Sequence, residues 1–253
     1  MTEPERLELA RPRELGELLG DAIAVYGRNF ATVFAISAAI VVPVQLIVSG
    51  IGLEGLTASY QEDGNTAEML IPTVVSFLVV APLIAAATIH LLRALADGER
   101  PHAGRALQAG LDVFAFVFVA VLLAGLGIAL GLAMLVLPGL FVAVRWLFVP
   151  QAVVVDGARG AGALRASWEL TRGFWWRTFG VVLLANAIAF LLGLLIAVPL
   201  EILAESADRQ AISLAGTILV ETLSAPFVAL VSTLLFFDLR ARQVAASAAG
   251  STD

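Results

Sequence analysis

Four polar side chains lie inside otherwise apolar stretches of this 253-residue sequence: Arg145, Glu221, Asn186 and Gln45. Ionisable groups are costly inside a hydrocarbon layer and are usually paired there. Arg145 and Glu221 fall at comparable depths of their stretches, so we predict an ion pair between them. Such a pair could line a cavity for a polar substrate or a proton. It could instead fix helix register, with the two amides as hydrogen-bonding groups between helices, and we favour this interpretation because no second acid or histidine chain accompanies the pair.

The usual catalytic and metal-binding patterns are absent from the sequence. Cysteine is missing, which excludes disulfides, thiolate ligands and a cysteine nucleophile. His90 and His102 have no acids at a metal-binding spacing, and no P-loop, HExxH motif or serine elbow is present. We therefore expect neither enzyme activity nor a cofactor or metal. The arginines are spread over many loops instead of forming a basic stripe, so nucleic-acid binding is not expected either.

The composition is typical of a membrane protein. Hydrophobic residues make up 60% of the chain and charged residues 14%, whereas a soluble domain is roughly 25% charged. Six continuous apolar runs are each long enough for a membrane-spanning helix, which takes about 20 residues. They lie near residues 30–53, 69–92, 111–137, 139–155, 175–200 and 211–237. Because apolar and polar residues do not alternate within these runs, the strands of a membrane β-barrel are disfavoured. The predicted fold is one all-α domain, residues 1–253, a polytopic bundle of about six transmembrane helices.

Two glycine-containing patterns concern the third and fourth runs. Pro138-Gly139 interrupts a stretch that is too long for one span, and the pair is a turn signal, so we predict a tight hairpin there. Gly127 and Gly131 form a GxxxG step, which lets helices approach closely. The step could serve a dimer, but we favour packing within the bundle.

The arginine distribution predicts the orientation in the membrane. Lysine is absent, and 13 of the 15 arginines lie before the first run, in or directly beside the second and fourth loops, or after the last run. The opposite loops carry Arg209 and several acids. Arginine-rich short loops stay in the cytoplasm, so both termini are expected there. No cleavable signal peptide is evident. The all-arginine usage in an alanine- and leucine-rich chain indicates a GC-rich bacterial genome, and hence a bacterial plasma membrane.

Cytoplasmic amphipathic helices are predicted beside the runs. Residues 12–29 and 156–174 each have an apolar stripe at helical spacing, and residues 103–111 have a weaker one. Three copies of an interfacial helix followed by a membrane hairpin indicate a threefold repeat. Such helices can bind lipid, but we favour tethered connectors, because the first has an acidic polar face. Residues near these segments form a predicted contact surface for a protein partner: Arg165, Trp168, Glu169, Arg172, Asp238 and Arg240.

Several short motifs resemble one group of bacterial membrane proteins. They are LGELL at residues 15–19, Pro138-Gly139 with Arg145, ALRASWELTRG at residues 163–173 and FFDLRAR at residues 236–242. These segments resemble the membrane domain of glycerophosphoryl diester phosphodiesterases and its stand-alone relatives. In fused members of that family a separate barrel domain hydrolyses phosphodiesters with histidine and acidic residues. None of those catalytic residues can be carried over to this chain, so the resemblance implies a membrane-domain role without hydrolysis.

Three functions follow as alternatives. The leading hypothesis is a non-enzymatic membrane scaffold or accessory module, which contacts the lipid bilayer and a protein partner on its cytoplasmic face. The second is a small permease or lipid-handling transporter, monomeric or dimeric, with its site near Arg145, Glu221 and Asn186. The third is an accessory component of glycerophosphodiester metabolism, acting with a separately encoded hydrolase.

Overall fold

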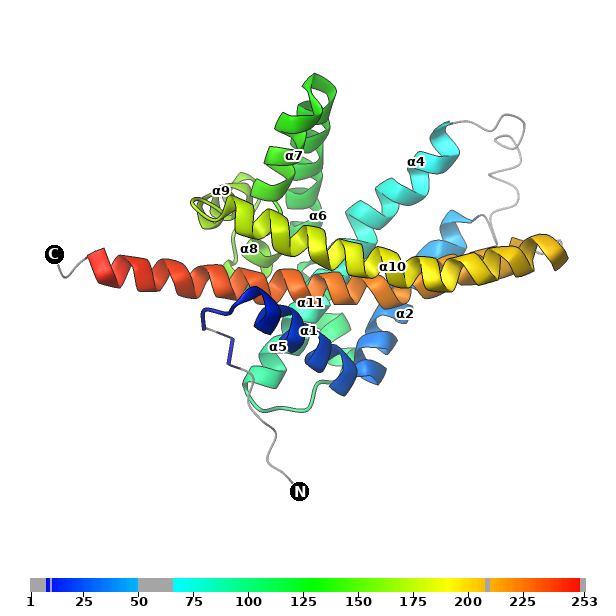
Figure 1. Ribbon diagram of the computed structural model, residues 1–253, viewed down its shortest axis with the longest axis horizontal. Helices are drawn as coiled ribbons and strands as arrows, with labels where there is room; N and C mark the ends of the chain where they lie inside the picture. Colours follow the sequence, from blue (N-terminus) through cyan, green and yellow to red (C-terminus); the bar gives the residue numbers. More distant parts are fainter. Residues whose placement is uncertain (1–7, 10, 50–65, 208–209, 251–253) are drawn as a thin grey trace.

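The computed structural model describes residues 8–9, 11–49, 66–207 and 210–250 (Figure 1). Within these ranges every regular element is helical, which confirms the predicted all-α fold. The elements are α1 (Leu15–Arg28), α2 (Phe30–Val48), α4 (Thr66–Val75), the π-helical turn η1 (Ser76–Val80), α5 (Ala81–Ala96), α6 (Ala103–Met134), α7 (Val136–Arg145), α8 (Val149–Asp156), α9 (Ala161–Leu170), α10 (Trp175–Ala207) and α11 (Gln210–Gly250). The predicted end of the first run, at residue 53, and Arg209 lie outside the described residues.

Six helical stretches in the described part of the chain are long and apolar enough to cross a membrane, as predicted: Phe30–Val48, Ile71–Ala96, Ala103–Met134, Val136–Asp156, Trp175–Leu203 and Ile212–Ala248. The third begins earlier than expected, because Ala103–Met134 is one continuous helix. A separate amphipathic helix at residues 103–111 was therefore a wrong prediction. No proline interrupts this stretch, and extending a helix is easier than nucleating a new one. The middle copy of the predicted threefold repeat thus lacks its own interfacial helix.

Helices α6 and α7 form the predicted tight hairpin, but the chain turns at Leu135 instead of at Pro138-Gly139. Leu135 is extended, with φ −165° and ψ 145°. Pro138 lies in the first turn of α7, where N–H groups lack an intrahelical acceptor and a missing one costs little. A Cβ added to Gly131 of α6 would lie 2.9 Å from the Cα of Gly139. The GxxxG step therefore packs within the bundle, which is the alternative that we favoured over a dimer contact.

The fourth predicted run, residues 139–155, contains a break that the sequence analysis did not anticipate. Helix α7 ends at Arg145, and α8 follows after a turn. Pro150 favours the break, because it cannot donate to the carbonyl four residues earlier. Ser167 of α9 replaces the lost hydrogen bonds: its Oγ accepts the N–H of Phe148 at 3.1 Å and its hydroxyl donates to the Arg145 carbonyl at 2.8 Å. Helix α9 therefore stabilises the break from the side.

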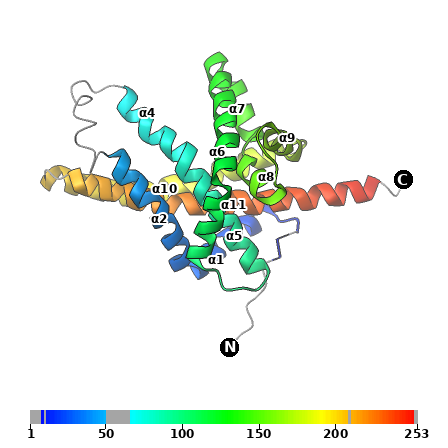
Figure 2. The ribbon, with the colours of Figure 1, turned by 180° about the vertical axis from the view of Figure 1, so that it is seen from behind.

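Helix α11 forms the centre of the bundle. It packs against α10, α2, α5 and α1, and Leu230, Leu234 and Leu235 in its middle are fully buried. Helices α10 and α11 lie side by side as a long antiparallel pair, and the α6–α7 hairpin projects away from them (Figures 1 and 2). The two hairpins therefore diverge from a shared core.

The other two predicted amphipathic segments do form separate helices. Helix α1 lies within residues 12–29 and buries Leu18 and Ala22 against the bundle. Helix α9 lies within residues 156–174 and buries Ala163 among its apolar contacts. The stripe predicted for α1 identified Leu18 and Ala22 of the buried face, whereas α9 buries Ala163, Ser167 and Leu170 and leaves Trp168 of its predicted stripe exposed.

Candidate functional site: a groove between two hairpins

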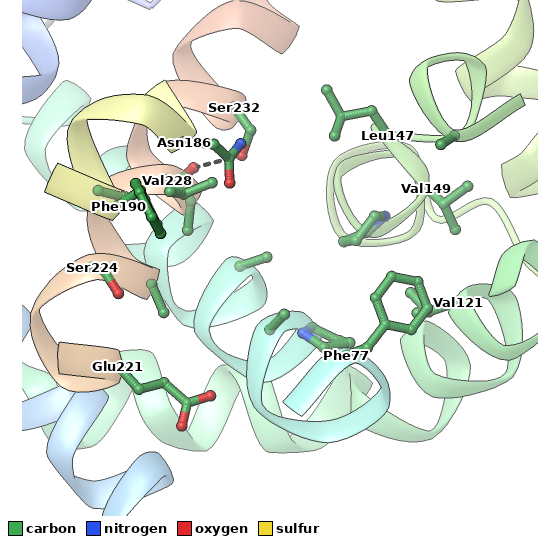
Figure 3. Close-up of a pocket in the computed structure, with 18 of the residues that line it drawn as sticks. Phe77, Val121, Leu147, Val149, Asn186, Phe190, Glu221, Ser224, Val228 and Ser232 are labelled. Atoms are coloured by element: carbon green, nitrogen blue, oxygen red, sulfur yellow. Dashed lines mark hydrogen bonds between the residues drawn. The ribbon is translucent and has the colours of Figure 1, made fainter. Parts of the chain in front are cut away.

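A cavity of about 810 Å³, here termed the large groove, lies between the α6–α7 and α10–α11 hairpins (Figure 3). Its lining comes from η1 and α5, from α6 and α7, from the turn between α7 and α8, from the start of α8, and from α10 and α11. Along α11 it extends from Val220 to Ser232, which is about 18 Å at about 1.5 Å per residue. This length is roughly half of a ~30 Å hydrocarbon core, or the depth of one leaflet.

The walls of the large groove are mainly apolar. Phe77 and Val121 line one side, and Phe190 and Val228 line the other (Figure 3). Phe190 is 64% exposed and its neighbour Leu194 is also exposed, so the groove is not sealed along α10. A cavity of this size, apolar with a few polar groups, is typical of a site for a small ligand.

Five polar residues interrupt this lining: Gln151, Asn186, Glu221, Ser224 and Ser232. Asn186 and Ser224 each donate to a carbonyl of their own helix, at 2.8 and 2.7 Å. Gln151 is 1% exposed, and its Nε2 donates to Ser232 Oγ at 3.3 Å. Its Oε1 is buried and has no hydrogen-bond partner among the described residues. Because an unsatisfied buried acceptor is costly, Gln151 is a candidate ligand-binding group.

Glu221 lies where the large groove meets a second cavity of about 480 Å³, here termed the small cavity. Gln45 of α2 is buried and donates through Nε2 to the Glu221 carboxylate. The small cavity is more polar than the groove, and its polar lining consists of Gln45, Thr73, Ser76, Glu201, Ser213, Thr217, Glu221 and Ser224. The structure thus brings together Gln45 and Glu221, two of the four predicted intramembrane residues. Asn186 lines the adjoining large groove.

Arg145 does not belong to this site, and the predicted Arg145–Glu221 ion pair does not form. The Arg145 guanidinium carbon lies 5.1 Å and 5.0 Å from the ring centroids of Phe141 and Trp168. Its Nη1 donates at 3.4 Å to the Trp168 carbonyl and to Thr171 Oγ1. Position along a helix sets the depth of a side chain but not the neighbour that it faces. Arg145 faces α9, and the rings of Phe141 on α7 and Trp168 on α9 stabilise the cation.

The predicted cytoplasmic contact surface is only partly available. Arg165 and Glu169 form an exposed ion pair on α9, with 2.8 Å between Nε and Oε1, and this hydrogen bond raises the pKa of Arg165. Arg172 is also exposed, and Trp168 is exposed at one edge. Arg240 of α11 forms an ion pair with the aspartate that ends α8. The accessible part of this surface therefore consists mainly of Arg165, Trp168 and Glu169 on α9 together with Arg172.

Asp238, by contrast, is fully buried, so its predicted place on the contact surface is wrong. Its carboxylate accepts the backbone N–H of Arg13 at 2.6 Å, Nε of Arg177 at 3.0 Å and Nε of Arg242 at 3.1 Å. The buried Arg13 side chain in turn binds Asp21 of α1 at 2.9 Å. This charge cluster ties the segment before α1 to α10 and α11. The spacing of Asp238 and Arg242, four residues apart on a helix, was the one sequence signal for it.

The fold and the six apolar spans define an all-α multi-pass membrane protein. Residues 105–239 match a family described as a domain of unknown function, DUF7847. Because this match covers more than half of the 253 residues, the chain belongs to that family. The matched segment includes most of both hairpins that enclose the large groove, whereas Gln45 and η1 lie outside it. No curated protein and no solved structure matches the chain.

Proposed function

We propose that this protein is a non-enzymatic, lipid-handling membrane protein that takes an apolar chain from the bilayer into the large groove. The observation that carries this proposal is the groove itself, about 810 Å³ in volume and apolar over most of its walls. It extends over roughly the depth of one leaflet. Aromatic and aliphatic side chains such as Phe77 and Val228 supply dispersion contacts for a hydrocarbon chain (Figure 3).

The exposed side of the groove supports a bilayer lipid as the occupant. Phe190 and Leu194 line the groove and are exposed on a helix long enough to span a membrane. In a bilayer such a surface contacts lipid chains, so a chain can enter from the side without crossing water. We place the protein in the bacterial plasma membrane with both termini in the cytoplasm, and the arginine-rich loops support this orientation.

Lipid transfer between leaflets tests the proposal. Purified protein is reconstituted into vesicles that contain a fluorescent lipid, and the outward-facing label is bleached with an impermeant reductant. Vesicles with the wild-type protein should lose more label than empty vesicles. Ala197 is half-buried and lines both cavities. Ala197→Phe fills their junction and should lower the transfer rate severalfold.

Ala187→Phe is the matched control, because Ala187 is an exposed residue of the same helix and lines neither cavity. It should transfer lipid at the wild-type rate. Equal rates for both variants, or no lipid transfer and no lipid retained by the purified wild-type protein in native mass spectrometry, would contradict the proposal.

The exposed α9 surface favours a second candidate, a scaffold or accessory module for a soluble partner. Arg165 and Glu169 pair with each other but are exposed to another protein, and Trp168 adds exposed apolar surface. The resemblance to the glycerophosphoryl diester phosphodiesterase membrane domain supports a hydrolase as that partner. Vesicles that carry the wild-type protein should then sediment a purified hydrolase of this class, and Arg165→Glu should abolish sedimentation. Equal sedimentation with empty vesicles would eliminate this candidate.

A further inference from the structure

The large groove and the small cavity share Ala197, Val220, Glu221 and Ser224 as lining residues. Together they follow α11 from Ser213 to Ser232, which corresponds to about 28 Å of helix. This is close to the ~30 Å thickness of a hydrocarbon core. The two cavities therefore lie end to end, with more polar residues in the lining of the small cavity than in that of the large groove, and with Glu221 lining both.

The hydrogen bonds determine which polar atoms can bind a ligand. Oxygens of backbone carbonyls and carboxylates only accept, so Asn186 must direct its NH2 group to the carbonyl in its own helix, and Gln45 must direct its NH2 group to Glu221. Ser232 donates its proton to a backbone carbonyl at 3.0 Å, so its oxygen must accept from Gln151 Nε2. One N–H of each of these three amide groups is thus bound within the protein. Their amide oxygens are left as acceptors.

Gln151 is the clearest sign that a donor is needed in the groove. Its side chain is 1% exposed, it lines the groove, and its Oε1 has no partner among the described residues. Charge favours the same ligand chemistry. Glu221 and Glu201 are acidic, and no basic residue is among the described lining residues of either cavity. The potential along the cavities is therefore negative.

We propose that the two cavities bind an amphiphile whose head group carries an ammonium, with its apolar chain in the large groove and its N–H donors directed to Glu221. The proposal rests on the lipid-handling function above and specifies the head group. A hydrogen bond from a cation to a carboxylate is roughly twice as strong as a neutral one, so an ammonium is favoured over a hydroxyl. An anionic head group would meet only acidic and neutral side chains. A single-chain amine and a two-chain aminolipid share this chemistry.

Trp146 lines the large groove and provides the readout. Octadecylamine, octadecanol and octadecanoic acid, each with a nitroxide on the chain, are added to the detergent-solubilised protein, and quenching of tryptophan fluorescence is measured. The difference in quenching between the wild-type protein and the Trp146→Phe variant reports binding in the large groove. The amine should reach half-saturation at about a tenfold lower mole fraction than the alcohol, and the acid should bind most weakly.

Glu221→Gln should bring the amine and the alcohol to similar affinity. Its amide oxygen can still accept from Gln45, so folding is preserved, and Gln151→Leu provides a second variant that should weaken amine binding. Glu169→Gln on the exposed face of α9 changes the net charge equally and should leave the preference intact. Displacement of the labelled amine by an unlabelled two-chain aminolipid would identify a bilayer lipid as the ligand, and lack of displacement a single-chain amine.

The outcomes separate this inference from the proposed function. If all three probes quench Trp146 equally, the groove binds chains but does not select an ammonium, and the inference is overturned while the lipid-handling function stands. An amine preference that survives in Glu221→Gln overturns it as well. If no probe quenches Trp146, the lipid-handling function itself fails.

Discussion

Replacing Asp238 by alanine tests whether the buried charge cluster holds the segment before α1 against the bundle. The change removes the shared acceptor of the Arg13 backbone N–H and of two guanidinium groups, those of Arg177 and Arg242. Both guanidinium groups also donate to the Arg13 carbonyl, at 2.5 and 2.7 Å. They would therefore remain close together without a negative charge between them.

The burial of these side chains indicates how much stability Asp238→Ala should lose. Removing one partner of a buried ion pair costs about 3–5 kcal/mol. Asp238 is fully buried, but the side chains of Arg177 and Arg242 are 23% and 30% exposed, so water can solvate them in part. We therefore expect a value near the lower limit, about 3 kcal/mol. Asp156→Ala removes a more exposed aspartate that also pairs with an arginine of α11. It should cost about 1 kcal/mol or less.

The assay is reversible unfolding in detergent, combined with tryptic cleavage at Arg13. Asp238→Ala should unfold at a clearly lower denaturant concentration than Asp156→Ala, and its N-terminal segment should be cleaved faster. Arg177→Ala combined with Asp238→Ala should destabilise by less than the sum of the single changes, because the two side chains interact directly. Equal midpoints for the two aspartate variants, or additive losses, would refute this account of the cluster.

Three further predictions test other parts of the structure. Gly131→Ala should destabilise by about 1–3 kcal/mol, because its Cβ would lie 2.9 Å from a backbone atom of α7; Gly104→Ala in open space should not, and equal unfolding midpoints would show that the hairpin is not tightly packed. Burial raises the pKa of Tyr26 above its ordinary value of about 10, so the stability that the neutral phenol contributes should be complete below pH 10 and decrease as the pH rises above it. Tyr26→Phe should remove this alkaline loss, as followed by thermal unfolding, and an unchanged pH profile would contradict it. A cysteine at Leu135 should react with an impermeant thiol reagent added outside intact cells, and one at Ala103 should not; the reverse pattern would invert the proposed orientation.

The membrane spans could be predicted because their signal is contained in the sequence itself. A run of about 20 apolar residues needs no knowledge of its neighbours to be identified as a spanning helix. The position of the break after Arg145 could not be predicted from the run itself. The hydrogen bonds at the break are completed by Ser167 from α9. Pro150 alone is compatible with either a kink or a full interruption.

The sequence predicted three polar residues of the candidate site, but it did not predict their pairing, and it missed Gln151. Glu221, Gln45 and Asn186 were identified because polar groups are rare in apolar runs. Their partners depend on how the helices are rotated about their axes, and apolar runs without a clear polar face do not specify this rotation. Arg145 was assigned to Glu221 by depth alone, whereas it lies against the rings of Phe141 on α7 and Trp168 on α9. The large groove arises from the divergence of two hairpins, for which no local pattern exists.

The bond between Arg13 and Asp238 also has a consequence for biosynthesis. The two residues are 225 positions apart in the chain. At about 5–20 residues per second, the ribosome needs roughly 10–45 s after Arg13 to make its acceptor. During that time the N-terminal segment can form its contact with Asp21 but cannot dock on the bundle. Maturation of the first helix is therefore completed only when the last helix enters the membrane.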